Sequence, residues 1–276
     1  MDRGRVIVTG ASSGIGEATA RHLHSIGFEV LPGVRRDADA ERLREDGFQP
    51  LLLDVTDAES IARCRGEAGE VELGGLVNNA GVAVAGPLEF VPIEELRHQL
   101  EINVIGQVAV TQAFLPALRR GRGRIVNISS IGGRVALPMA GPYAASKFAL
   151  EAISDSLRRE VGRHGVDVIV IEPGGIKTPI WEKGGAKADE LQARMPPESD
   201  RLYGDLVRAV RAESDKIATE RGLEPSAVAE VVGEALTAQR PRTRYLVGRD
   251  AKLRARLARV APDRLFDRLI SRALSI

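Results

Sequence analysis

Several features that mark particular classes of protein are scarce or absent in this sequence. Cys64 is the single cysteine, which excludes an intrachain disulfide and favours a reducing, cytoplasmic compartment. The four histidines show no metal-ligand spacing, so we expect no metal site. No stretch of about 18 apolar residues could span a membrane. The apolar run at residues 6–8 is too short for the core of a signal peptide.

Neither sign of charge is in excess. The 276 residues include 39 basic and 38 acidic side chains, for a formal net charge of +1. Such a chain has no overall field that would gather nucleic acid, so no nucleic-acid partner is expected. Hydrophobic residues make up 43% and charged residues 28%, which is ordinary for one globular domain with a buried core.

Short β-branched segments alternate with longer helical patterns along the chain. This alternation predicts an α/β fold with a doubly wound parallel sheet, because helices that cover both faces allow the strands to be apolar throughout. The predicted strands are residues 6–9, 28–31, 51–53, 76–77, 124–128, 166–171 and 244–247. The predicted helices are residues 14–26, 93–118 and 142–161. We interpret residues 1–248 as one domain.

Two segments depart from this alternation. Residues 179–222 are charged and contain Pro196-Pro197, which predicts helical pieces with a break. As an insertion after a strand, they would overhang the carboxyl ends of the sheet, where open sheets bind ligands. Residues 249–276 hold eight basic and three acidic residues, and apolar positions on both sides of Pro262 predict two amphipathic helices. Such a tail packs on its domain or on a partner subunit, or lies on an anionic membrane.

A glycine-rich turn follows the first predicted strand and reads Thr9-Gly10-Ala11-Ser12-Ser13-Gly14-Ile15-Gly16. Glycines permit positive φ and a close approach of the backbone, and the next helix offers free N–H groups to a pyrophosphate. A dinucleotide is therefore the expected ligand, and a plain tight turn is the alternative. The spacing differs from the G-x-G-x-x-G fingerprint.

Tyr143 and Lys147 stand four residues apart in a predicted helix, so their side chains share one face. A nearby ammonium lowers the pKa of a tyrosine from about 10 toward the neutral range, which would let Tyr143 act as a general acid or base. Ser130 follows the strand at 124–128 and would emerge at the same rim of the sheet. The Tyr-to-Lys spacing is common by accident, so this assignment depends on the other motifs.

Four motifs follow one another along the chain in an order that is typical of one enzyme family: the glycine-rich turn, Asn78-Asn79-Ala80-Gly81, Tyr143-Ala-Ala-Ser-Lys147 and Pro173-Gly174. The sequence resembles the short-chain dehydrogenase/reductase family in its basic form, over about residues 5–248. The resemblance implies a Rossmann fold and an oxidoreductase that interconverts an alcohol and a carbonyl with a nicotinamide dinucleotide. A homodimer or homotetramer is expected.

The resemblance also implies roles for individual residues. Ser130, rather than Ser129, would hold the substrate oxygen, Lys147 would hold the nicotinamide ribose, and Asn103 would position Lys147 through water. The implied catalytic residues are Asn103, Ser130, Tyr143 and Lys147. The implied cofactor-binding residues are Gly10, Ser12, Ser13, Gly14, Ile15, Gly16, Arg35, Asp54, Val55, Asn79, Ala80, Gly81, Tyr143, Lys147, Pro173, Gly174, Ile176 and Thr178.

The choice of cofactor depends on the end of the second strand. Val34 stands where NAD-preferring relatives carry aspartate, and Arg35 follows it, which favours NADP(H). Asp37 and Asp39 lie just beyond, so NAD(H) stays possible. Arg35 could also belong to a plain charged turn.

The insertion, with Trp181 and Tyr203, resembles the substrate loop of family members that act on steroids and retinoids, and Leu137 and Met139 fit an apolar pocket. A small hydrophobic alcohol or carbonyl compound is therefore the expected substrate. Two other readings stay open, a nicotinamide-binding regulator without turnover and a 3-ketoacyl reductase with the same catalytic residues.

Overall fold

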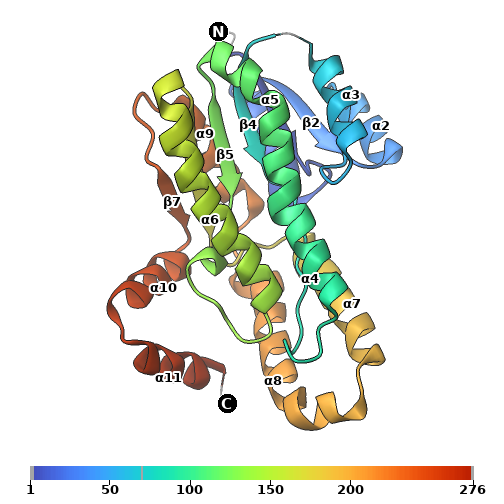
Figure 1. Cartoon of the computed structure of the whole chain (residues 1–276), viewed down its shortest axis with the longest axis vertical. Coiled ribbons are helices and arrows are strands. Elements are labelled where there is room, and N and C mark those ends of the chain that lie inside the picture. The colour runs from blue at the N-terminus through green and yellow to red at the C-terminus, as the bar shows by residue number, and fades with distance from the viewer. Residues whose placement is uncertain (1–2, 70, 275–276) are drawn as a thin grey trace.

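The computed structural model describes residues 3–69 and 71–274 and is built around a seven-stranded sheet (Figure 1). All neighbouring strands are parallel, in the order β3-β2-β1-β4-β5-β6-β7. The strands are β1 (Arg5–Thr9), β2 (Glu29–Val34), β3 (Leu51–Leu52), β4 (Leu73–Asn78), β5 (Arg124–Ile128), β6 (Asp167–Pro173) and β7 (Arg244–Val247). The predicted doubly wound α/β fold and its seven strands are confirmed, although β2 continues to Val34 and β4 starts at Leu73.

Helices cover both faces of the sheet, as Figure 1 shows. The α-helices are α1 (Gly14–Ser25), α2 (Asp37–Glu45), α3 (Ala58–Ala68), α4 (Ile93–Leu100), α5 (Gln107–Gly121), α6 (Gly141–Val161), α7 (Pro179–Arg194), α8 (Pro197–Lys216), α9 (Pro225–Thr237), α10 (Arg249–Val260) and α11 (Asp263–Leu274). Shorter helical segments are the π-helical η1 (Glu101–Gly106) and η4 (Ile217–Arg221) and the 3₁₀-helical η2 (Ile131–Gly133) and η3 (Gly162–His164).

Two apolar clusters flank the sheet and explain why it is stable. On one face, α1, α2 and α9 bury side chains such as Leu23, Leu43 and Val232 against the strands. On the other face, α3, α5 and α6 do the same with side chains such as Ile61 and Phe114. Each fully buried side chain of this size contributes about 1.5–3 kcal/mol to the stability of the fold. Because helices bury both faces of the sheet, its strands are apolar without polar alternation.

The long helix predicted at 93–118 is present but not uniform. It runs from Ile93 to Gly121, and its middle turn, η1, is π-helical. A π-turn holds one residue more than an α-turn and is frequent at functional sites. Asn103 lies in this segment and is fully buried.

Both departures from the α/β alternation are helical. The first comprises α7, α8 and η4, with the predicted break at Met195 and Pro196 between α7 and α8. In the tail, α10 packs through Ala251 and Ala255, whereas α11 has no buried residue. No helix within residues 3–69 and 71–274 is long and apolar enough to cross a membrane.

Candidate active site

A large cavity opens at the carboxyl ends of the strands, next to the point where the strand order reverses between β1 and β4. Its volume is about 1530 Å³. Ligand pockets usually measure about 300–1,000 Å³, so this cavity has room for a cofactor and a substrate together. Every residue predicted to bind the cofactor or to act in catalysis lines it, with the single exception of Gly16.

The glycine-rich turn forms one end of the cavity. Gly10 and Gly14 have φ values of 64° and 58°, a left-handed conformation that favours glycine. Gly16 is buried under this turn rather than exposed to the cavity, and a Cβ there would collide with the Gly10 carbonyl and the Asn79 amide. Gly16 therefore contributes to the shape of the turn, and its place among the cofactor-binding residues stays a prediction. Its lack of a side chain lets α1 begin close under the turn.

Side chains from other elements fix the shape of this turn. The Asn79 amide donates to the carbonyls of Thr9 and Gly10 at 2.9 and 3.1 Å, and the Thr9 hydroxyl accepts from the Asn79 N–H at 2.9 Å. Arg42 of α2 donates to the Ser12 carbonyl at 2.8 Å. We did not expect Thr9 or Arg42 from the sequence, because a bond between α2 and the turn depends on how the helix packs.

Tyr143, Ser130 and Lys147 lie together in the middle of the cavity. Ser130 follows β5, and Tyr143 and Lys147 stand one turn apart in α6. The Lys147 Nζ donates to the Ile128 carbonyl at 2.8 Å and lies 5.7 Å from the centre of the Tyr143 ring. Ser129 also lines the cavity but is buried, and its Oγ has no hydrogen-bond partner among the described residues.

The pKa values in this group differ from the expectation based on sequence. Burial raises the pKa of Tyr143, and a hydrogen bond with Ser130 lowers it by less, so the net direction is upward. The predicted downward shift is wrong for the chain by itself, because the sequence does not show how much protein covers the phenol. Burial also lowers the pKa of Lys147 to about 8, against the opposing charge of Glu151.

Asn103 is held by polar contacts to its surroundings. Its Oδ1 accepts from the Val82 N–H at 2.9 Å, and its Nδ2 donates to the Val82 carbonyl at 3.0 Å and to the Ser146 Oγ at 3.1 Å. The Asn103 Oδ1 would also crowd any side chain placed at Gly81, 3.3 Å from the added Cβ. Asn103 therefore joins η1, the loop after β4 and α6.

A buried charge cluster that the sequence did not reveal lies behind Lys147. Glu172 of β6 has no exposed surface and accepts from Arg134 at 2.7 and 2.9 Å, and Arg244 lies 3.3 Å from it. Arg244 also donates to Glu151 at 3.0 Å. Burial raises the pKa of Glu172, and the hydrogen bond from Arg134 opposes this rise. The cluster links β6, β7 and α6 with the loop that carries Ser130.

The charges at the end of β2 favour NADP(H). Arg35 lines the cavity and makes no ion pair within the described part of the chain, so its guanidinium is available to an added phosphate. Asp39 is paired with Arg36 at 2.7 Å, and Asp37 does not line the cavity. This arrangement weakens the case for NAD(H) but still allows it.

Two more of the predicted cofactor-binding residues, Asp54 and Thr178, line the cavity. Burial raises the pKa of Asp54, but the bonds that it accepts from the Thr56 N–H and hydroxyl, together with the charges of Arg35 and His98, lower it overall. Thr178 is the N-cap residue before α7 and lies against Gly14, so that the start of α7 meets the glycine-rich turn.

Comparison with known proteins decides the family. The family model described as short chain dehydrogenase matches residues 5–189. The chain belongs to the short-chain dehydrogenase family. Like other members, this short-chain dehydrogenase is an oxidoreductase that acts on CH–OH groups.

Similar proteins cover nearly the whole chain. An NADPH-dependent 3-dehydrocapnine reductase from Ornithobacterium rhinotracheale is 38% identical over 97% of this chain and 96% of its own. Mouse retinol dehydrogenase 5 is 38% identical over 96% of this chain and 87% of its own. A short chain dehydrogenase from Burkholderia cenocepacia, solved in complex with NADP, has a TM-score of 0.76 at 26% identity and covers 98% of this short-chain dehydrogenase and 99% of its own chain.

One further residue of the site was missed. Asp250, in the first turn of α10, accepts from the Gly175 N–H at 2.9 Å, and its carboxylate would collide with any Cβ at Gly174. The tail thus supports the loop after β6, 75 residues away in sequence. A contact over this separation leaves no local signal in the sequence.

Proposed function

We propose that this chain is an NADPH-dependent reductase of bulky hydrophobic ketones or aldehydes, and a dehydrogenase of the corresponding alcohols. The observation that carries the proposal is the meeting of Tyr143, Ser130 and Lys147 in one cavity with a glycine-rich turn. The predicted apolar pocket is supported by Leu137 and Met139, which line the same cavity.

The residues present fit a nicotinamide dinucleotide. The turn at Gly10 and Gly14 presents backbone and the start of α1 to a pyrophosphate. Arg35 fits a ribose phosphate, and Asp54 and Val55 line the place expected for the adenine. When bound, the dinucleotide supplies or accepts the hydride.

The chain's own groups manage the proton and the substrate oxygen. We assign Tyr143 as the group whose Oη donates a proton to the carbonyl oxygen during reduction and takes it back during oxidation. Ser130 donates a hydrogen bond to the same oxygen and so polarises the carbonyl. The Lys147 ammonium stabilises the phenolate that remains on Tyr143. Asn103 is a positioning residue for this group.

The assay is oxidation of NADPH and of NADH by purified protein with a panel of steroid, retinoid and small polar carbonyl compounds. We expect bulky apolar compounds to be reduced best, and NADPH to be preferred. Replacing Tyr143 by Phe removes the proton donor and keeps the ring, so kcat should fall at least about a hundredfold. Preserved cofactor binding in Tyr143→Phe is the control for folding.

Two results would overturn the proposal. Binding of the dinucleotide without turnover of any compound would indicate a regulator. Equal or better turnover of small polar compounds would remove the apolar substrate.

We also propose that the protein is a cytoplasmic homodimer or homotetramer and that its tail contacts anionic membranes. The free thiol of Cys64 supports the compartment. Leu265 and Leu269 are exposed on α11, which also carries the exposed Arg264, Arg268 and Arg272, and this combination supports an interfacial contact. Flotation with anionic vesicles, compared with a chain ending at Gly248, tests the membrane contact, and light scattering tests the assembly. Equal flotation of the full chain and of the chain ending at Gly248 would refute the membrane contact. A monomer in light scattering would refute the assembly.

A further inference from the structure

The tail forms part of the wall of the catalytic cavity. Arg254 of α10 and Leu274 of α11 line the same cavity as Ser130 and Tyr143. The tail is therefore in contact with whatever the cavity binds, in addition to its contacts with the rest of the chain.

Arg254 differs from the other basic residues of the tail. Seven of the eight basic side chains between residues 249 and 274 are exposed to solvent, and Arg254 is the exception. It makes no hydrogen bond or ion pair with any residue in 3–69 or 71–274. An unpaired guanidinium that lines a cavity is available to pair with an anionic group of a bound molecule.

The position of Arg254 is well defined. Ala251 and Ala255 on the adjacent face of α10 are buried against Ile131 and Val135, close to the loop that carries Ser130. Asp250, one turn before Arg254 and on the same side of the helix, accepts from the Gly175 N–H. Both contacts place Arg254 beside the substrate half of the cavity.

Other cations of the cavity are either paired or lie toward the cofactor. Arg211 pairs with Asp189, and Lys187 pairs with Glu95 at 2.8 Å. Lys183 is close enough to Asp39 to lower the pKa of that carboxyl, which places it at the end of β2.

Acidic groups on the α8 wall do not neutralise Arg254. Glu213 pairs with Arg221 at 3.2 Å. Asp215 is exposed and raises the pKa of Arg211, so it lies near that guanidinium.

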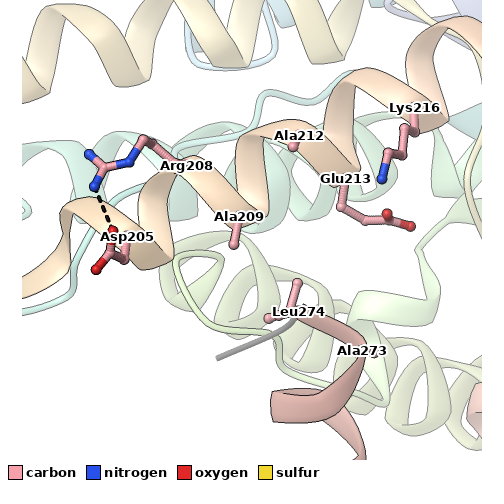
Figure 2. A pocket seen from close by; sticks show the side chains of 8 residues that line it. All are labelled: Asp205, Arg208, Ala209, Ala212, Glu213, Lys216, Ala273 and Leu274. Atoms are coloured by element: carbon pink, nitrogen blue, oxygen red, sulfur yellow. Dashed lines mark hydrogen bonds and ion pairs between the residues drawn. The ribbon is translucent and has the colours of Figure 1, made fainter.

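A second cleft leads on from this point. A cleft between α8 and α11 adjoins the cavity, since Glu213 and Leu274 line both. Figure 2 shows Ala209, Ala212, Ala273 and Leu274 along this cleft, with the Asp205–Arg208 pair at its edge. Glu213 and Lys216 line the cleft too, so an alkyl chain that extends beyond Arg254 would meet both apolar and charged side chains.

We propose that the cavity binds an amphiphilic ketone or alcohol with an anionic group, a carboxylate or a sulfonate, and that Arg254 pairs with this group. The proposal rests on the proposed function, because the same substrate presents its carbonyl to Tyr143. Arg254 is thus a specificity-determining residue rather than a catalytic one. A guanidinium fork suits both kinds of anion.

The test compares oxo-octadecanoates, which carry the ketone at different distances from the carboxylate, with their uncharged methyl esters and with oxo-alkyl sulfonates. We expect the wild type to reduce at least one acid or sulfonate with a KM about ten- to a hundredfold below that of its matched ester or neutral analogue. Arg254→Ala should remove this difference by raising the KM of the anion, with kcat and the ester nearly unchanged. Arg254→Lys should restore part of it.

Arg256→Ala is the matched control, because Arg256 lies on the same helix, is exposed and does not line the cavity. It should keep the wild-type preference. Three results would overturn the anion site: equal KM for acids, sulfonates and neutral compounds in the wild type, an unchanged preference in Arg254→Ala, or a weaker Kd for NADPH in Arg254→Ala. Failure of the proposed function gives a different result, namely no reduction of acids, sulfonates or esters.

Discussion

At the scale of single residues, Lys147 is subject to two opposing influences. Burial lowers the pKa of its ammonium to about 8, while the Glu151 carboxylate one turn further along α6 raises it. Lys147 must be charged to stabilise a phenolate on Tyr143. Its charge is present below its pKa and is lost as the pH rises through about 8.

We therefore predict that kcat/KM for ketone reduction declines above a midpoint near pH 8 and that Glu151→Gln lowers this midpoint. Removing the anion leaves burial unopposed, so the shift should be about one pH unit downward. The pH profile of kcat/KM measures it. Glu160→Gln changes an exposed carboxylate of the same helix and should leave the midpoint in place. A midpoint that does not move in Glu151→Gln contradicts the prediction.

Which site residues could be predicted depends on how local their signals are. Ser130, Tyr143 and Lys147 belong to short motifs, and the structure places all three in one cavity. The direction of the Tyr143 pKa shift and the support of Gly175 by Asp250 depend on packing between segments far apart in sequence. Spacing along the chain carries no information about such contacts.

At the scale of elements, the seven strands were predictable because parallel strands buried on both faces are apolar runs. We did not predict α2, α3 or α9. Helix α2 buries only Ala40 and Leu43, so its pattern is faint. The π-helical turn of η1 was not predictable either, since its extra residue changes no apolar spacing strongly enough to notice.

The charge cluster behind Lys147 joins several elements, and Arg244 is its centre. Arg244 lies within 3.3 Å of Glu172 and 3.0 Å of both Glu151 and Asp155. Glu172 also has one carboxylate oxygen without a partner in the described structure. Loss of Arg244 would leave buried carboxylates of like charge close together.

We predict that Arg244→Met lowers the free energy of unfolding by about 3–5 kcal/mol, because it leaves buried charge uncompensated. Urea denaturation measures the change. Adding Glu172→Gln to Arg244→Met should restore part of the loss, whereas the control Arg249→Met, at an exposed position, should cost less than about 0.5 kcal/mol. Equal stability of Arg244→Met and wild type would show that the cluster contributes little.

At the scale of the whole molecule, Cys64 reports on the integrity of the fold. It is 1% exposed between α3 and the sheet, and burial raises the pKa of its thiol to about 11. Because only the thiolate reacts with alkylating agents, the burial of Cys64 and the raised pKa of its thiol both protect it from alkylation. The sequence shows that there is one cysteine but not that it is inert.

We predict that iodoacetamide does not label the native protein at pH 8 within hours and labels it completely in denaturant. Intact mass measures the labelling. Arg244→Met should be labelled faster than wild type, because a less stable fold opens more often. Rapid labelling of the native wild type would contradict the buried position.

The π-helical turn in the helix from Ile93 to Gly121 makes the length of this helix indispensable. Deleting one residue from η1 would let the helix become regular, and each residue of an α-helix accounts for about 100° of rotation. Because the wide turn absorbs the extra residue locally, such a deletion would leave α4 and α5 facing as before and would rearrange η1 itself. Asn103, whose side chain bonds Val82 and Ser146 from this turn, would then lose its position. The site should therefore tolerate many substitutions along this helix better than the loss of a single residue from it.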